Sequence, residues 1–82
     1  MRLKGKAAII TGAGAGIGEA TAVLLAKEGS SVCCGDLTDS GLKVAKKIKE
    51  SGGNAIFVQG DVSKAEDAKR IIDKTIETYG RL

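Results

Sequence analysis

Three short apolar runs alternate with three amphipathic stretches along this chain, and the alternation constrains its fold more than any other feature. The predicted strands are residues 7–11, 31–37 and 55–59. The predicted helices are residues 17–28, a second from Asp39 to the pair Gly52 and Gly53, and a third from Ser63 to Gly80. Strands that alternate with helices form parallel sheets with right-handed crossovers. The sequence therefore predicts an α/β fold of order β-α-β-α-β-α.

Each predicted helix carries one apolar stripe that we expect to face the sheet. The stripes are Ile17, Ala20 and Leu24 in the first helix, Leu42, Ala45 and Ile48 in the second, and Ala65, Ala68, Ile72, Ile76 and Tyr79 in the third. Asp39 is expected to cap the second helix, and Ser63 with Glu66 matches the capping-box pattern. The first strand, AAIIT, is apolar enough to predict burial on both of its faces.

Composition excludes several classes of protein. The 82 residues suffice for one compact domain, and 43% hydrophobic with 28% charged residues is typical of a globular protein. A net charge of +3, spread along the chain with two aromatic residues, argues against a nucleic-acid binder. No apolar run is long enough to cross a membrane, and we identify no signal peptide. The adjacent cysteines Cys33 and Cys34, in a chain without histidine, favour a reduced cytoplasmic protein without a metal site.

A glycine-rich turn, residues 12–18, joins the first strand to the first helix. Backbone amides without partners and the positive end of the helix dipole make such a turn suitable for a phosphate. Gly12, Gly16 and Gly18 follow a GxxxGxG spacing rather than GxGxxG, and no Gly-Lys-Ser/Thr follows as a P-loop requires. A tight structural turn is the alternative, but the strand-turn-helix context favours phosphate binding.

Two aspartates close the next two strands. Asp36 stands eighteen residues after Gly18, where a carboxylate can accept hydrogen bonds from ribose hydroxyls and repel a 2′-phosphate. The alternative role for Asp36 is to start a turn. Asp61 follows the third strand and could contact an adenine, or it could mark the start of the third helix. We hold these two interpretations of Asp61 equal.

The segment TGAGAGIG at residues 11–18, Asp36, and the triplet Gly60-Asp61-Val62 together resemble the short-chain dehydrogenase/reductase family over the whole chain. The resemblance implies a Rossmann-like half-fold, with a three-stranded parallel sheet in the order 3-2-1 and flanking helices. By position, it implies a pyrophosphate lined by Gly12, Gly16, Ile17 and Gly18. It also places Asp36 and Leu37 at the adenosine ribose, and Asp61 and Val62 beside the adenine.

The resemblance also bears on the choice of cofactor. Members that use the phosphorylated dinucleotide often carry a basic residue at the position of Ala15 or of Leu37. Neither residue is basic here, and Asp36 is present. The cofactor expected is therefore NAD.

The catalytic residues of the family are missing from these 82 residues. Members have an Asn-Asn-Ala-Gly segment, a catalytic Ser and a Tyr-x-x-x-Lys pair, and Tyr79 cannot supply that pair because only three residues follow it. The chain is thus expected to be a single truncated dinucleotide-binding domain, residues 1–82, without turnover of its own. In the full enzyme, hydride would pass between nicotinamide and a carbonyl or alcohol substrate.

Two further functions stay open. The chain could be a non-catalytic dinucleotide-binding module, which tight binding without turnover would favour. It could also be a half-fold that assembles with a copy of itself. A catalytic signature downstream of Leu82 in the gene would favour the enzyme.

The sheet order that the resemblance implies leaves the first strand at an open edge. Ala7 to Thr11 is apolar and has no proline or inward charge to protect it, with only Lys4 and Lys6 beside it. Ile72 and Ile76 of the third helix would be partly exposed to solvent. We therefore expect a homodimer paired through the first strand.

Overall fold

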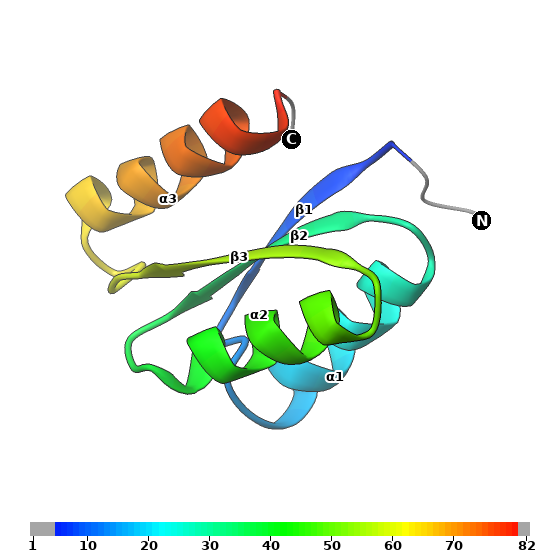
Figure 1. The fold of residues 1–82 in the computed structure, drawn as a ribbon. Helices are drawn as coiled ribbons and strands as arrows, with labels where there is room; N and C mark the ends of the chain where they lie inside the picture. Colours follow the sequence, from blue (N-terminus) through cyan, green and yellow to red (C-terminus); the bar gives the residue numbers. More distant parts are fainter. Residues whose placement is uncertain (1–4, 81–82) are drawn as a thin grey trace.

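The computed structural model describes residues 5–80, in which strands and helices alternate strictly (Figure 1). The strands are β1 (Ala7–Thr11), β2 (Ser31–Asp36) and β3 (Asn54–Gln59). The helices are α1 (Gly16–Lys27), α2 (Ser40–Glu50) and α3 (Ala65–Tyr79). All six predicted elements are present, close to their predicted ends. None of the helices in this range is long and apolar enough to cross a membrane.

The three strands form one parallel sheet with β2 in the middle. Ala7 lies opposite Ser31, and Ser31 lies opposite Asn54. The order β1-β2-β3 confirms the expected order 3-2-1, read from the opposite edge. α1 and α2 lie on one face and α3 on the other (Figure 1). Right-handed crossovers explain this, because β1 to β2 and β2 to β3 step in the same direction across the sheet.

Consecutive side chains of β2 face opposite sides of the sheet, and both sides are buried. Val32 and Cys34 pack with α1 and α2 in the main hydrophobic cluster, together with Ala22, Val44 and Ile48. Cys33 is fully buried as well, and its burial raises the pKa of its thiol, an effect that the nearby Thr75 of α3 partly offsets. Both thiols are free, as predicted, and burial raises the pKa of Cys34 to about 11. The two thiols therefore stay protonated at neutral pH.

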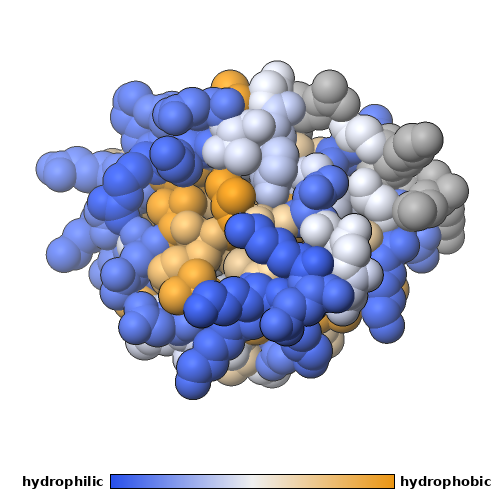
Figure 2. All heavy atoms as spheres, viewed as in Figure 1, coloured by the Kyte–Doolittle hydropathy of each residue, from blue (hydrophilic) through white to orange (hydrophobic). Residues whose placement is uncertain are grey.

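The two outer strands are only half covered. The prediction that β1 is buried on both faces is wrong: Ala7 to Ile10 are half-buried and Thr11 is exposed. No strand among residues 5–80 pairs with the outer edge of β1. Lys4, expected beside this edge, lies outside the described residues. At the other edge, Ile56, Phe57 and Val58 of β3 are half-buried, and a hydrophobic strip follows β3 between the hydrophilic outer faces of α2 and α3 (Figure 2).

The predicted apolar stripe of α1 faces outward instead of toward the sheet. Ile17 is 87% exposed, Leu24 is 58% exposed, and Ala20 is exposed as well. Ala22 is the fully buried residue, one helical turn after Gly18. Small residues at these two positions allow the backbone of α1 to approach the sheet closely, which large aliphatic side chains would prevent. The stripe of smallest residues, rather than the most apolar one, is therefore the buried stripe.

The buried faces of α2 and α3 also differ in part from the predicted stripes. In α2, Ala45 and Ile48 are buried as expected. Leu42, which was predicted to be buried, is exposed, and Val44 is buried instead. The four lysines of α2 all lie on its exposed side.

In α3, the fully buried residues are Ile71 and Thr75, one turn apart. Ile72 and Ile76, predicted on the buried stripe, are 41% and 45% exposed, and Ala65 is exposed. Thr75 tolerates burial because its hydroxyl donates to Ile71 O at 2.8 Å. The expectation that Ile72 and Ile76 would be partly exposed to solvent is confirmed.

The predicted helix caps are not formed by the predicted side chains. Asp39 precedes α2 as expected, but its side chain makes no capping hydrogen bond. The capping box is wrong: Lys64 occupies the cap position of α3, and the Ser63 hydroxyl donates to Asp61 Oδ1 at 2.6 Å. Asp61 competes successfully for Ser63 because an Asp side chain readily accepts hydrogen bonds from the residue two positions on.

Candidate functional site

The glycine-rich loop between β1 and α1 leaves open space above two of its glycines. Gly12 and Gly16 have φ angles of 65° and 56°, and a Cβ on either would meet nothing within 4 Å. Ala15 precedes α1 in an extended conformation, and its side chain makes no capping hydrogen bond. The first amides of a helix have no acceptor within the helix. The loop therefore offers uncapped amides beside open space, as a phosphate requires.

Two other glycines of this loop are packed tightly. A Cβ on Gly18 would overlap the backbone oxygen of Gly12. A Cβ on Gly14 would overlap Asp36 Oδ2 and the side chain of Ser40. The loop is thus pressed against the end of β2 and the start of α2. This contact brings the predicted phosphate-binding and ribose-binding residues to one place.

Asp36 holds the end of β2 and also faces the glycine-rich loop. Its Oδ1 accepts the amide of Leu37 at 2.8 Å, which is the turn-starting role considered above. Its Oδ2 lies against Gly14. The backbone oxygen of Asp36 accepts the amide of Gly60 at 2.9 Å, which joins the ends of β2 and β3. One carboxylate oxygen therefore serves the turn, and the other points to the loop where a nucleotide would lie.

Asp61 forms the turn that leads into α3. Its Oδ1 accepts the amide of Ser63 at 2.9 Å in addition to the hydroxyl bond. These hydrogen bonds from Ser63 lower the pKa of Asp61, so the carboxylate is charged at neutral pH. This geometry supports the helix-starting interpretation, and both hydrogen bonds from Ser63 fall on the same oxygen, Oδ1.

The other predicted site residues expose their side chains. Ile17 points into solvent, Leu37 is 61% exposed and Ala15 is exposed, so their backbones are the parts that can line the site. Val62 is half exposed and lines a groove between β1 and α3, together with Thr11. Val62 therefore lies on the β1 side of this end of the sheet.

Sequence reasoning missed three contributors to this end of the sheet. Gly14 and Ser40 pack around Asp36, and the Gln59 side-chain amide donates to Leu37 O at 2.9 Å. Gly14 carried a detectable signal, since it lies within the glycine-rich segment. The roles of Ser40 and Gln59 depend on contacts between distant segments, which no local pattern reveals.

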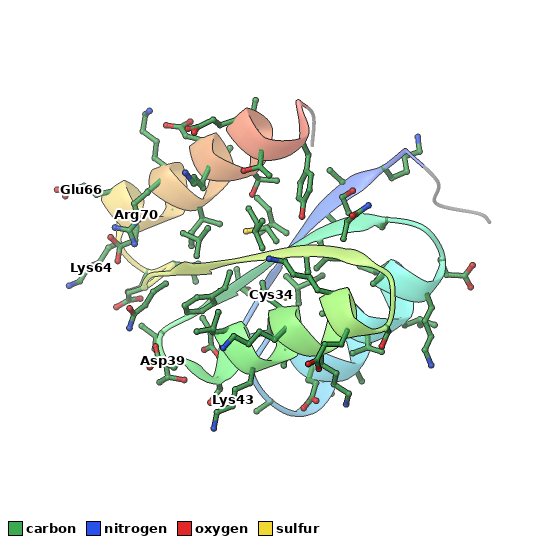
Figure 3. All side chains as sticks on the ribbon, viewed as in Figure 1. Cys34, Asp39, Lys43, Lys64, Glu66 and Arg70 are labelled. Carbon is green, nitrogen blue, oxygen red and sulfur yellow. The ribbon has the colours of Figure 1, made fainter. Side chains whose placement is uncertain are left out.

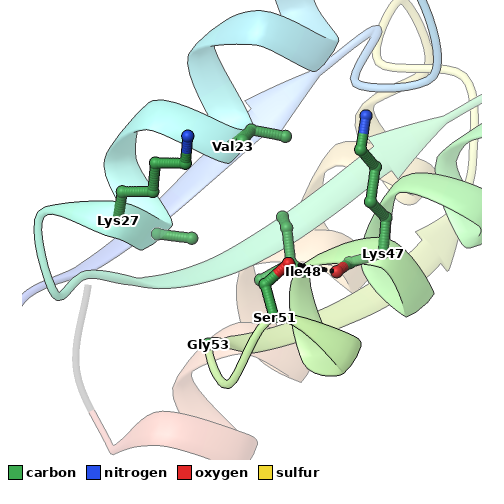
Figure 4. Close-up of a pocket in the computed structure, with 7 residues that line it drawn as sticks. Val23, Lys27, Lys47, Ile48, Ser51 and Gly53 are labelled. Carbon is green, nitrogen blue, oxygen red and sulfur yellow. Dashed lines mark hydrogen bonds between the residues drawn. The ribbon is translucent and has the colours of Figure 1, made fainter.

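A pocket between α1 and α2 lies away from these residues (Figure 4). It is lined by the last turns of both helices, with Val23 and Lys27 from α1 and Lys47 and Ile48 from α2. Basic residues in a last helical turn offset the negative end of the helix dipole, which accounts for these lysines. Within residues 5–80 there is no group of three side chains that could hold a metal ion. The carboxyl ends of the strands remain the candidate site.

Known proteins similar to this chain are oxidoreductases. The family profile described as short chain dehydrogenase matches residues 6–82. An uncharacterized oxidoreductase of Thermotoga maritima is 46% identical, with all of this chain aligned to 32% of that protein. Tropinone reductase-like 1 of Erythroxylum coca is 44% identical, with 99% of this chain aligned to 29% of that protein. The chain thus spans about a third of the length of these relatives.

Solved structures give the same result. A hydroxysteroid dehydrogenase from Escherichia coli superposes with a TM-score of 0.96 at 38% identity, covering 99% of this chain and 35% of that one. A 7α-hydroxysteroid dehydrogenase complexed with NADH and 7-oxo glycochenodeoxycholic acid has a TM-score of 0.95 at 38% identity, covering 99% of this chain and 32% of that one. Both agree with the Rossmann-like arrangement of the three strands. Profile, relatives and fold together show that the chain belongs to the short-chain dehydrogenase family of oxidoreductases.

Proposed function

We propose that this chain binds NAD at the carboxyl ends of its strands, as the cofactor-binding portion of a short-chain oxidoreductase. The observation that carries the proposal is the contact between the Asp36 carboxylate and Gly14 of the glycine-rich loop. The carboxylate expected at the ribose thus lies beside the loop expected at the phosphates, which supports the proposal. The similar 7α-hydroxysteroid dehydrogenase that was solved with NADH supports a nicotinamide cofactor.

The residues of this chain fit a dinucleotide. The open space above Gly12 and Gly16 allows a pyrophosphate to approach the backbone, where side chains would block it. The amides at the start of α1 would donate to its oxygens, with backbone contacts from Ala15, Ile17 and Gly18. Asp36 and Leu37 would hold the adenosine ribose, and Asp61 and Val62 would border the adenine. The nicotinamide ring would supply hydride transfer to or from a carbonyl or alcohol substrate bound by the complete enzyme.

Asp36 should favour NAD over NADP. A 2′-phosphate would bring negative charge against this carboxylate, and no basic side chain stands at the positions of Ala15 or Leu37 to offset it. We expect NAD to bind at least about tenfold more tightly than NADP. Asp36→Ala should narrow that ratio, measured by isothermal titration calorimetry with both dinucleotides.

Asp39→Ala is the matched control for Asp36→Ala. Asp39 is an exposed carboxylate three residues away whose side chain makes no capping hydrogen bond. It should leave the ratio of the two affinities unchanged. Equal or tighter binding of NADP by the unmodified chain would refute the assignment of NAD.

We further propose that two copies of this chain pair through the edges of β1. The edge is apolar and half-buried, and the groove beside it is lined by Ala8, Ile9 and Ile72, among others. Pairing of the two β1 edges about a two-fold axis would join the two three-stranded sheets into one continuous sheet. It would also cover the groove beside β1 in each copy. Burial of this apolar surface would stabilise each copy.

Ile9→Lys tests this homodimer. A charge in the groove beside β1 should convert the dimer to monomer in sedimentation velocity at micromolar concentration. Lys43→Glu, an exposed change on the outer side of α2, should leave the dimer intact. A folded monomer of the unmodified chain under these conditions would contradict the proposed pairing.

A cytoplasmic location completes the proposal. Cys33 and Cys34 are both free thiols, which persist in a reducing compartment.

A further inference from the structure

The loop between β3 and α3 is tied to the first turns of α3 by two side chains. The Asp61 amide donates to Asp67 Oδ2 at 2.8 Å. Arg70 donates to the backbone oxygen of Gln59, and its guanidinium lies 3.5 Å from Asp67 Oδ1. In Figure 3, Arg70 extends from α3 toward the end of β3, whereas Lys64 and Glu66 point away from it. Asp67 and Arg70 together hold the backbone on both sides of Gly60.

Gly60 shows how closely this loop is packed on α3. A Cβ at Gly60 would lie 2.9 Å from Arg70 Nη2 and 3.3 Å from Asp67 Cβ. A side chain at this position would displace the guanidinium of Arg70 and with it the hydrogen bond to Gln59 O. The side chain of Asp67 is 25% exposed, so its hydrogen bond to Asp61 is partly shielded from water.

The same contacts reach the ribose side of the site. Gln59, whose backbone oxygen accepts from Arg70, donates through its side chain to Leu37 O. Gly60, between Gln59 and Asp61, donates its amide to Asp36 O. The backbones of Leu37 and Asp61, which the proposed function places at the ribose and the adenine, are therefore linked through one network centred on Asp67 and Arg70.

We propose that Asp67 is a positioning residue that, with Arg70, sets the affinity of this site for the adenosine half of a dinucleotide by fixing the backbone from Gln59 to Asp61. This inference rests on the proposed function, since it assumes that adenosine binds beside Asp61. Asp67 itself would not touch the nucleotide. Its effect should be confined to the adenosine half, because the glycine-rich loop is built from a different part of the chain.

Calorimetry with two probes tests the inference: AMP for the adenosine half and inorganic pyrophosphate for the glycine-rich loop. Asp67→Ala should weaken AMP binding about fivefold, the size expected for one lost hydrogen bond, and leave pyrophosphate binding unchanged. Asp67→Asn keeps an acceptor oxygen for the Asp61 amide and should restore most of the AMP affinity. Asp73→Ala is the matched control, since this carboxylate lies on the same helix and contacts Lys69 instead.

Amide hydrogen exchange at Asp61 gives an independent readout. Exchange should be about tenfold faster in Asp67→Ala than in the unmodified chain, and close to normal in Asp67→Asn. If Asp67→Ala does not fold, Arg70→Met, which removes the donor to Gln59, should show the same selective loss of AMP affinity.

The outcomes separate the inference from the proposed function. AMP affinity in Asp67→Ala equal to that in Asp73→Ala would overturn the inference alone, provided that the unmodified chain binds AMP. A parallel loss of AMP and pyrophosphate binding would also overturn it, because the effect would then not be local. An unmodified chain that binds neither probe would overturn the proposed function and the inference with it.

Discussion

On one face of the sheet α1 and α2 together cover Val32 and Cys34, whereas on the other face α3 alone covers Cys33. The first face is closed by residues such as Val44 and Ile48 that are almost fully buried. On the second face, Ile72, which lines the groove between β1 and α3, is 41% exposed, and Ile76 is 45% exposed.

The closed face therefore stabilises the fold, and the half-covered face has apolar surface available for assembly. The α1–α2 face contains the cluster that gives this chain most of its hydrophobic stabilisation. The α3 face retains apolar surface that a second surface can still bury, and the proposed homodimer would use this surface. The loop that carries Asp61 begins α3 and therefore belongs to the less covered face. Three measurements test this contrast.

Truncation of one isoleucine on each face should have the largest effect. Ile48 on the α1–α2 face and Ile71 on the α3 face are both 2% exposed. Ile48→Ala should reduce the free energy of unfolding by about 4 kcal/mol, and Ile71→Ala by about 2 kcal/mol. Both side chains border a pocket, but Ile48 also belongs to the main hydrophobic cluster, so its truncation removes contacts with more buried apolar neighbours. The cavity left by Ile71 opens into the larger groove beside β1 and can fill with water. Urea denaturation monitored by circular dichroism measures both.

The order of these two losses is the informative result. A larger loss for Ile71→Ala than for Ile48→Ala would show that α3 stabilises the fold as strongly as α1 and α2 do, and would remove the contrast.

Thiol reactivity should report the same contrast at a smaller scale. Burial raises the pKa of both Cys33 and Cys34, so both should react slowly with an aromatic disulfide reagent at pH 8. Cys33 should still react about tenfold faster, because detachment of α3 alone exposes it. Labelling rates of Cys33→Ala and Cys34→Ala, each with one remaining thiol, give the two values. Equal rates would mean that both thiols become accessible only through global unfolding.

Alkaline pH should produce the smallest of the three effects, a decrease in the free energy of unfolding caused by ionisation of Tyr79 on the α3 face. Burial, and then the neighbouring thiols, raise the pKa of Tyr79 to about 12 from an ordinary value of 10. The folded state therefore holds this proton more tightly, and its contribution to stability, present below pH 10, is lost as the pH rises toward 12.

Tyr79→Phe isolates this effect. It removes the phenol proton and the hydrogen bond from the hydroxyl to Val32 O, which measures 3.3 Å. The variant should lose at most about 1 kcal/mol at pH 8, since the phenol is partly exposed to solvent. It should also lose less stability between pH 10 and 12 than the parent chain, measured by urea denaturation. An identical alkaline decline in both proteins would assign the effect to other groups.

The sequence predicted the order of elements well because local signals mark their ends. Glycines follow α1 and α2, and the amide of Gly80 donates to Ile76 O at 2.7 Å where α3 ends. The buried helix faces were predicted less well. Hydropathy favoured Ile17 and Leu24 over Ala22, although close packing of α1 selects small residues. Thr75 was missed because its burial depends on a hydrogen bond within the helix.

The site was predictable where it depends on spacing along the chain. Gly12, Gly16 and Asp36 lie at one end of the sheet, as parallel strands require. Asp67 and Arg70 could not be identified in this way. Their hydrogen bonds to Asp61 and Gln59 join a helix to the loop before it, and an Asp or Arg on a charged helix usually contacts only solvent.

The double-sided burial of β2 restricts how the length of this chain can change. An insertion of one residue within β2 would exchange the side chains of its two faces, moving Cys33 to the α1–α2 side. The same insertion would turn Asp36 away from Gly14 and so separate the residues proposed to bind the ribose and the phosphates. The turns before β2 and β3 carry no such parity constraint. Length variation among natural homologues should therefore accumulate in those turns and be rare within β2.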